Sequence, residues 1–153
     1  MTHVTVVGAG FAGCEAAWTL AQNGIPVTLW EMKPQKFSPA HHSPDFAELI
    51  CSNSFKASRL ESAAGLLKAE MERLGSLCVP CAKETAVAAG GALAVDRDRF
   101  SALVAEKIRN HPLITVREGE ITEIPDGNVI IATGPLTSEA LSAAIGELIS
   151  AEY

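Results

Sequence analysis

The first thirty-one residues constrain the fold most, because they combine a strand, a glycine-rich turn, a helix and a second strand. An apolar run ends at Val7 and is followed at once by Gly8-Ala9-Gly10-Phe11-Ala12-Gly13. An alanine-rich segment then predicts a helix that stops at Gly24, and residues 26–30 predict the second strand. This spacing is typical of a βαβ unit, in which the two strands are parallel neighbours.

The glycine turn predicts a dinucleotide-binding site. Gly8 permits the sharp turn, Gly10 lets the backbone approach a pyrophosphate, and Gly13 lets the helix pack closely on the strand. The N-terminus of the helix adds N–H groups and a partial positive charge. Glu31 follows Gly13 by 18 residues, where a carboxylate can accept hydrogen bonds from ribose hydroxyls. The alternative is a chance glycine turn. We predict cofactor contacts from Gly8, Ala9, Gly10, Phe11, Ala12, Gly13 and Glu31.

Composition sets the class of protein. With 153 residues and 48% hydrophobic side chains, the chain can bury a globular core. Its 12 basic and 18 acidic residues give a net charge of −6, which argues against broad, non-specific attraction to nucleic acid. No apolar run reaches the length of a membrane span, and the N-terminus enters a strand without a leader pattern. We therefore expect a soluble cytoplasmic protein that does not bind membranes.

The four cysteines do not form a metal-binding pattern. Cys14 and Cys51 stand alone, and Cys78-Val79-Pro80-Cys81 is a single C-x-x-C without the second pair that a structural zinc site needs. His41 and His42 could add ligands, but their spacing fits a solvated loop better. We predict no metal site, and we favour an ordinary helix end over a redox pair for the C-x-x-C segment.

The rest of the chain alternates between helices and short strands. Residues 33–59 hold a proline-rich loop with four basic and two acidic side chains, and we predict that this segment is a cofactor or substrate loop. Asp96 is a good N-cap for the helix that follows it. The patterns predict helices at 60–74, 97–110 and 138–149 and strands at 92–95, 113–117, 120–124 and 129–132.

The last of these strands resembles a part of the FAD domain of glutathione-reductase-type flavoproteins. There an apolar strand that ends in Ala-Thr-Gly returns beside the dinucleotide, and residues 129–132 followed by Thr133 and Gly134 fit that pattern. The resemblance implies an α/β fold, namely a Rossmann-like FAD-binding domain. It also implies that Thr133 and Gly134 lie near the cofactor and that the cofactor is FAD rather than NAD.

Three longer motifs are similar to those of the folate- and FAD-dependent tRNA uracil-5-methyltransferases. They are Leu49-Ile50-Cys51-Ser52-Asn53-Ser54-Phe55, Gly90-Gly91-Ala92-Leu93-Ala94-Val95-Asp96-Arg97 and Ala132-Thr133-Gly134-Pro135-Leu136-Thr137-Ser138. A second family, the large carboxymethylaminomethyl-uridine modification flavoprotein, shares only Gly13-Cys14-Glu15-Ala16-Ala17.

This resemblance implies methylation of uridine C5 in the tRNA T-loop. 5,10-Methylenetetrahydrofolate is the one-carbon donor, FAD supplies electrons, and NAD(P)H reduces the flavin. Uracil C5 is a poor nucleophile until C6 is attacked or a proton is removed, so a thiol is needed. Cys51 matches the cysteine of the family's C-S-N-S motif. Its role as acid/base or covalent partner stays open, and a merely buried apolar cysteine is the alternative.

Members of that family extend well beyond 153 residues. We therefore expect residues 1–153 to be the N-terminal portion of the FAD-binding domain, an incomplete fragment that is inactive alone. We expect tRNA and folate to bind through the full-length protein. The alternatives are another FAD-dependent oxidoreductase, the second modification flavoprotein, or a non-catalytic FAD- or NAD-binding module.

Overall fold

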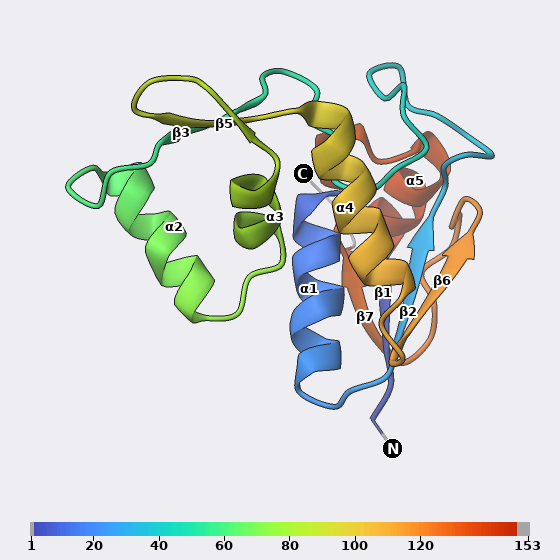
Figure 1. Cartoon of the computed structure of the whole chain (residues 1–153). Helices are drawn as coiled ribbons and strands as arrows, with labels where there is room; N and C mark the ends of the chain where they lie inside the picture. Colours follow the sequence, from blue (N-terminus) through green and yellow to red (C-terminus); the bar gives the residue numbers. More distant parts are fainter. Residues whose placement is uncertain (1, 150–153) are drawn as a thin grey trace.

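The computed structural model describes residues 2–149 and shows two β-sheets with helices packed around them (Figure 1). The elements, in chain order, are β1 (Val4–Val7), α1 (Phe11–Gln22), β2 (Val27–Glu31), β3 (Ser54–Ala57), α2 (Ala63–Arg73), α3 (Cys78–Glu84), β4 (Ala86–Val87), β5 (Ala92–Val95), α4 (Arg97–Arg109), β6 (Ile114–Glu118), β7 (Asn128–Ile131), the 3-10 turn η1 (Gly134–Leu136) and α5 (Glu139–Leu148).

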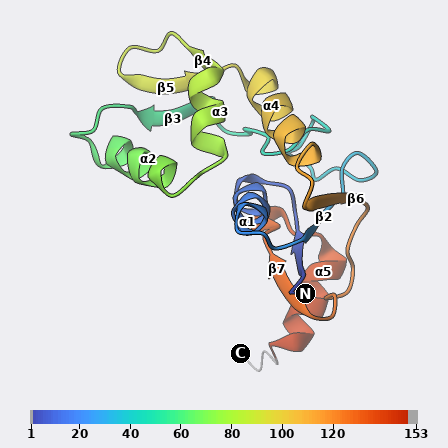
Figure 2. The ribbon, with the colours of Figure 1, turned by 60° about the horizontal axis from the view of Figure 1, so that its bottom comes forward.

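The larger sheet has four parallel strands in the order β6-β2-β1-β7. Val6 at its centre pairs with Leu29 on one side and Ile130 on the other, and both Val6 and Leu29 are fully buried. Helices α1 and α4 cover one face of this sheet, and α5 lies against the other (Figure 2). The sheet is therefore covered on both faces, as parallel sheets usually are. This confirms the predicted α/β fold.

Two glycines at the end of β1 are required by close packing. A Cβ on Gly13 would lie 1.7 Å from the carbonyl oxygen of Gly8, so α1 could not start so near the strand with any larger residue. Gly8 itself has φ +99°, and a Cβ there would lie 2.8 Å from the carbonyl oxygen of Ala132. Hence these glycines let β1, α1 and the end of β7 converge.

A small lobe, residues 54–95, lies to one side of the large sheet (Figures 1 and 2). Its three-stranded antiparallel sheet has the order β3-β5-β4, and α2 and α3 pack beside it. Helix α2 begins after the N-cap Ser62, whose hydroxyl accepts the Gly65 N–H at 3.1 Å. The apolar face predicted for residues 60–74 is largely exposed, with Leu67 and Leu74 at 56% and 83% exposure.

Two sequence predictions were wrong. Residues 120–124 do not form a strand, because β6 is the edge of the sheet and Glu120 turns away to bind Lys36. The C-x-x-C segment, expected to be a helix end, instead begins the separate helix α3. Pro80 is tolerated there because it falls in the first turn, where its missing N–H would have no intrahelical acceptor.

The predicted cap of α4 is confirmed, since the Asp96 carboxylate accepts the Arg99 N–H at 3.1 Å. Among the described residues, no helix combines the length and the apolar character needed to cross a membrane.

Candidate dinucleotide-binding site

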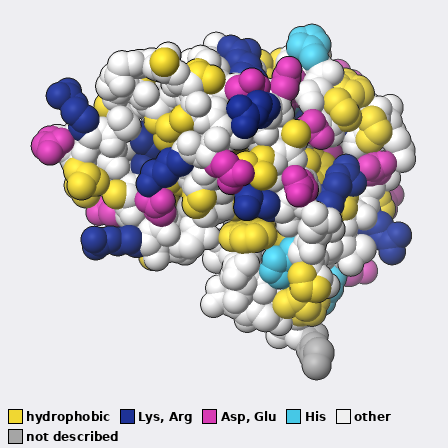
Figure 3. All heavy atoms as spheres, viewed as in Figure 1, with side chains coloured by type: hydrophobic (Ala, Val, Ile, Leu, Met, Phe, Trp, Pro, Cys, Tyr) yellow, Lys and Arg dark blue, Asp and Glu magenta, His cyan; other side chains and the backbone are white. Residues whose placement is uncertain are grey.

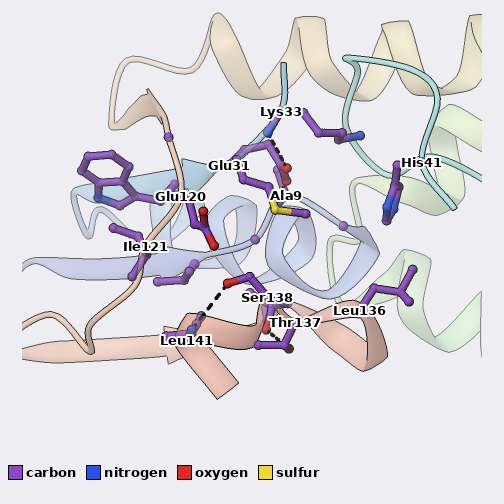
Figure 4. A pocket seen from close by; sticks show the side chains of 18 of the residues that line it. Ala9, Glu31, Lys33, His41, Glu120, Ile121, Leu136, Thr137, Ser138 and Leu141 are labelled. Atoms are coloured by element: carbon purple, nitrogen blue, oxygen red, sulfur yellow. Dashed lines mark hydrogen bonds between the residues drawn. The ribbon is translucent and has the colours of Figure 1, made fainter. Parts of the chain in front are cut away.

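An open cavity lies at the carboxyl ends of the parallel strands (Figure 4). It encloses about 670 Å³ including its mouth, and its walls come from the ends of β1, β2, β6 and β7 and from the start of α5. β1 pairs with β2 on one side and with β7 on the other, so the strand order reverses there. Open α/β sheets place their ligands at such a switch point.

Glu31, the last residue of β2, faces this cavity with a buried carboxylate. Its Oε2 accepts the Ala9 N–H at 2.8 Å, and its Oε1 accepts the Lys33 N–H at 3.0 Å. A carboxylate has about four lone-pair sites. Glu31 is therefore fixed against the glycine turn and still has acceptor capacity for hydroxyl groups.

The N-terminus of α1 forms the next part of the wall. Gly10 is its N-cap and offers no side-chain acceptor to the first turn. A Cβ on Gly10 would meet no protein atom within 4 Å, unlike one on Gly8 or Gly13. Protein packing thus does not require glycine at this position, and the space beside the backbone is open to the cavity.

The loop after β2 is fastened to the cavity by a buried lysine. The Lys33 ammonium donates to the carbonyl oxygens of Ser43 and Asp45 at 3.0 and 2.5 Å, and it lies 3.5 Å from Glu48 Oε2. Burial opposes ionisation of Glu48, but N–H groups of His42 and Ser43, with the charge of Lys33, lower its pKa below the ordinary value. Glu48 is therefore held as an anion that neutralises Lys33.

The segment after β7 closes the opposite side. Thr133 Oγ1 lies 2.5 Å from Thr137 Oγ1, which also donates to the Gly134 carbonyl at 2.8 Å. Gly134 has φ +65°, a conformation that favours glycine. These bonds shape the turn that leads from β7 into α5.

The structure brings five of the predicted cofactor residues to the cavity wall: Gly8, Ala9, Gly10, Glu31 and Thr133. The other predicted residues, Phe11, Ala12, Gly13 and Gly134, do not line it. The ring of Phe11 instead packs against Phe100 and Phe55, with centroid distances of 5.6 and 5.7 Å.

Sequence reasoning missed several wall residues. Trp30, His41, Glu120, Ile121, Leu136 and Ser138 all line the cavity. They come from loops and strand ends separated by up to 108 positions. His41 falls in the predicted loop, and Leu136 and Ser138 fall in the motif that begins at Ala132, but no local pattern marks Trp30, Glu120 or Ile121. Only knowledge of the strand order could have brought them together.

Cys51 lies apart from the cavity wall, exposed and unoxidised in the segment before β3. This segment is fixed by Asn53, whose side chain donates to the Val95 carbonyl at 3.0 Å while its own carbonyl accepts the Val95 N–H at 2.9 Å. Arg97 adds a longer bond, 3.4 Å, to the Ile50 carbonyl. The exposed thiol therefore lies on a segment that these hydrogen bonds keep in place.

The remaining cysteines are buried, and none forms a disulfide. Burial, reinforced by nearby glutamates, raises the pKa of the Cys14 and Cys78 thiols far above the ordinary value. Burial also raises the pKa of Cys81 to about 11. These thiols stay protonated at neutral pH, which disfavours redox use of the C-x-x-C segment. Within residues 2–149, no group of three or more His, Cys, Asp or Glu could hold a metal ion.

Comparison with known proteins supports this description. A relative from Geotalea uraniireducens, named methylenetetrahydrofolate--tRNA-(uracil-5-)-methyltransferase TrmFO, is 62% identical over 145 residues, which cover 94% of this chain and 33% of that protein. A relative of the same name from Bacillus subtilis is 56% identical and covers 98% of this chain and 34% of its own. The predicted resemblance is thus confirmed, and the chain spans about a third of the length of these curated relatives.

The fold matches that of a solved structure as well. Aquifex aeolicus GidA superimposes with a TM-score of 0.64 at 17% identity, over 82% of this chain and 21% of that one. The family described as "Glucose inhibited division protein A" matches residues 3–148, almost the entire sequence. The chain therefore belongs to the glucose inhibited division protein A family.

Proposed function

We propose that this chain is the FAD-binding part of a methylenetetrahydrofolate- and FAD-dependent tRNA (uracil-5-)-methyltransferase. One observation carries the proposal: Gly10, beside which no protein atom among the described residues lies within 4 Å of a Cβ position, and the buried carboxylate of Glu31 line the same cavity. The relatives at 56% and 62% identity, which carry that enzyme's name, support the choice of reaction.

The residues present fit the adenosine diphosphate half of FAD. The N-terminus of α1 offers its first-turn N–H groups to the pyrophosphate, and Glu31 accepts from the ribose hydroxyls. Gly8 and Gly13 hold the turn, and Thr133 and Gly134 bring the end of β7 beside it. When bound, FAD supplies the electrons that convert a methylene unit to a methyl group. NAD(P)H is the proposed reductant, and 5,10-methylenetetrahydrofolate the proposed one-carbon donor.

Cys51 is the proposed catalytic residue. As a thiolate, its exposed side chain either adds to C6 of the uracil ring or acts as a base that takes up a proton from that ring. The Asn53–Val95 bonds keep the segment in place. Residues 33–59, which end in and just after β3, then have two tasks: the start of this range closes the cofactor cavity, and the segment before β3 presents Cys51 to the substrate.

The tRNA substrate places the activity in the cytoplasm and requires a cationic surface. On the face shown in Figure 3, acidic and basic side chains are interspersed, with no continuous field of one sign. Lys33 and Lys36 are already paired with Glu48 and Glu120. Lys56 and Arg59 are exposed near Cys51 in sequence, so we propose that these two reach tRNA phosphates.

Cofactor binding is tested by purifying the 153-residue chain and recording its visible spectrum with and without added FAD. We expect FAD to bind and to be lost in Glu31→Ala, with Glu123→Ala, an exposed carboxylate outside the cavity wall, as the control. A chain that binds NAD instead of FAD would contradict the proposal.

Catalysis is tested in the full-length protein by tRNA methylation with folate and reduced flavin. Cys51→Ala should abolish methylation, whereas the neighbouring Ser52→Ala should retain it. Retained methylation in Cys51→Ala would exclude Cys51 as the catalytic residue, whereas a full-length protein that oxidises reduced flavin without methylating tRNA would point to another flavin oxidoreductase activity. Methylation by the isolated 153-residue chain would contradict the expectation that this part is inactive alone.

The tRNA contact is tested by neutralising Lys56 and Arg59 together in the full-length protein. The two substitutions should lower tRNA affinity and reduce the slope of affinity against salt by roughly two phosphate contacts. Lys83 and Arg109, which are paired with Glu72 and Glu118, serve as the matched control. Equal salt slopes in the two double variants would show that Lys56 and Arg59 do not contact tRNA, so that the basic residues of 33–59 would serve only flavin binding.

A further inference from the structure

Of the two basic side chains that line the cavity, Lys33 is paired with a carboxylate and His41 is paired with none in the described part of the chain. Three carboxylates line the wall, namely Glu31, Glu48 and Glu120, and the last of these is paired with Lys36 at 2.7 Å. The Lys33 ammonium in the wall is neutralised by Glu48, and its other bonds go to backbone carbonyls. A pyrophosphate would bring further negative charge into this setting. A cation or a strong donor besides the helix N-terminus is therefore needed to balance it.

His41 is placed to supply that donor. It lines the cavity from the loop that Lys33 and Glu48 fasten. Figure 4 shows its ring beside Leu136, at the opposite end of the cavity from Ile121, with Ala9 of the glycine turn between them. The ring therefore faces the same cavity as the glycine turn, which is the part of such a fold that holds phosphates.

The ring is oriented by a buried serine. Ser38 Oγ lies 2.5 Å from His41 Nδ1 and accepts the Ala40 N–H at 3.3 Å. The Ser38 hydroxyl can donate its hydrogen to Nδ1 while its oxygen accepts the Ala40 N–H. The neutral ring then carries its hydrogen on Nε2, which has no hydrogen-bond partner among residues 2–149. A phosphate oxygen only accepts hydrogen bonds, so it would pair with an Nε2 that carries a hydrogen.

The adjacent His42 differs in every one of these respects. Its side chain is exposed and does not line the cavity, and its backbone N–H donates to Glu48 Oε1 at 2.9 Å. The loop therefore presents one histidine to the cavity and one to solvent, which gives an internal control.

We propose that His41 is a ligand of the phosphate groups of the bound dinucleotide, oriented by Ser38. This inference rests on the proposed function, because it concerns the same cavity. His41 would then be a second hydrogen-bond donor to the phosphates, beside the N–H groups at the N-terminus of α1. The loop from Lys33 to Glu48 would therefore recognise the ligand as well as cover it.

The test is an NMR titration of the isotope-labelled 153-residue chain with ADP and, separately, with adenosine. Because His41→Ala removes a hydrogen bond to a charged phosphate, we expect it to weaken ADP binding about ten- to a hundredfold. Adenosine, which has no phosphate, should bind as it does to the unmodified chain. His42→Ala should leave both affinities unchanged, and the Ala9 and Gly10 amide signals should report the site in each variant.

Each other result is decisive. Equal ADP affinity in His41→Ala and His42→Ala would overturn the inference, and so would an equal loss for ADP and adenosine, which indicates a damaged cavity. If His41→Ala does not fold, His41→Gln, which keeps an N–H donor without a charge, should show a smaller ADP-specific loss; no loss overturns the inference. If the unmodified chain folds but binds neither ADP nor FAD, the proposed function fails, and the inference with it. If ADP binding depends on Glu31 but not on His41, the inference about His41 is wrong and the proposed function still holds.

Discussion

The large parallel sheet and the small lobe are stabilised in different ways. In the large sheet, Val6 and Leu29 are fully buried, and glycines let backbone pack directly on backbone. In the small lobe, β3 and β4 are two to four residues long, and Leu67 and Leu74 of α2 are exposed. The cavity belongs to the first region and Cys51 adjoins the second. The shape of the cavity is thus fixed by backbone packing, whereas the segment that carries the thiol is held by a few hydrogen bonds of Asn53 and Arg97.

Several contacts join the regions, among them the packing of α3 on α4 and the Asp96 N–H bond to the Thr85 carbonyl, and two more involve α1. The Glu15 carboxylate of α1 accepts the Leu77 and Cys78 N–H groups at 3.0 and 2.9 Å and the Ser76 hydroxyl at 2.5 Å. It thereby caps α3, which has no side-chain cap of its own. In addition, Phe11, Phe55 and Phe100 form an aromatic cluster between α1, β3 and α4.

The largest expected effect comes from adding one methyl group in each region. Gly13→Ala places a Cβ 1.7 Å from the Gly8 carbonyl oxygen, and Gly65→Ala places one 1.9 Å from the Arg59 carbonyl oxygen. Both clash, but Arg59 lies on an exposed turn that can move, whereas Gly8 is fixed between β1 and Ala132. We expect Gly13→Ala to lower the free energy of unfolding by more than about 3 kcal/mol, and Gly65→Ala by roughly half as much.

Urea unfolding measures both values, and Gly10→Ala is the control. Because a Cβ on Gly10 meets nothing within 4 Å, this variant should unfold like the unmodified chain yet bind ADP more weakly. A Gly65→Ala variant that is less stable than Gly13→Ala would reverse the comparison between the two regions.

A smaller loss of stability should follow when the contact of Glu15 between the large sheet and the small lobe is removed. Glu15→Ala removes the acceptor for two N–H groups and a hydroxyl at the start of α3. We expect a loss of about 2–3 kcal/mol in the free energy of unfolding, as for buried donors left without partners. Hydrogen exchange should be faster in α3 than in β1 or β2. Uniform acceleration over the whole chain would show that the two regions unfold as one unit.

The loop that closes the cavity should respond to acid through Glu48. The pKa of Glu48 is lowered in the folded chain, so its ionisation stabilises the fold above the ordinary glutamate pKa, roughly 4.3. That contribution is lost as pH falls through the lower folded value. Glu48→Gln, which leaves Lys33 without its counterion, should cost about 1–2 kcal/mol at neutral pH.

The measurement is urea unfolding of both chains between pH 7 and pH 3. The difference in stability between Glu48→Gln and the unmodified chain should shrink as the pH falls below the glutamate range, since both then lack the carboxylate charge. A difference that stays constant with pH would mean that the lost contact is not ionic.

The same division explains what the sequence could predict. Strands β1 and β2, the glycine turn and the Asp96 cap follow from local spacing, and the structure places all of them as expected. The small lobe was harder to predict, because α3 depends on a cap from Glu15, 61 to 63 positions away. Residues 120–124 have a strand-like pattern, but no neighbouring strand is present on that side of β6 among the described residues.

The candidate site shows a similar limit. The glycines and Glu31 could be named because their spacing reflects one backbone geometry. His41 could not be distinguished from His42, since the two differ only in which way a loop turns. That turn is set by Lys33, whose partners lie 10 to 15 positions ahead along the chain and form no motif.

The smallest expected effect concerns the exposed face of α2. Leu74 is 83% exposed, so Leu74→Ser removes almost no buried apolar surface and should change the free energy of unfolding by less than about 0.5 kcal/mol. Leu29, fully buried in the large sheet, is the contrast, and Leu29→Ala should cost about 2–5 kcal/mol. Both are measured by urea unfolding of the isolated chain. If Leu74→Ser proves as costly as Leu29→Ala, α2 is covered in solution, and the small lobe is as tightly packed as the sheet beside it.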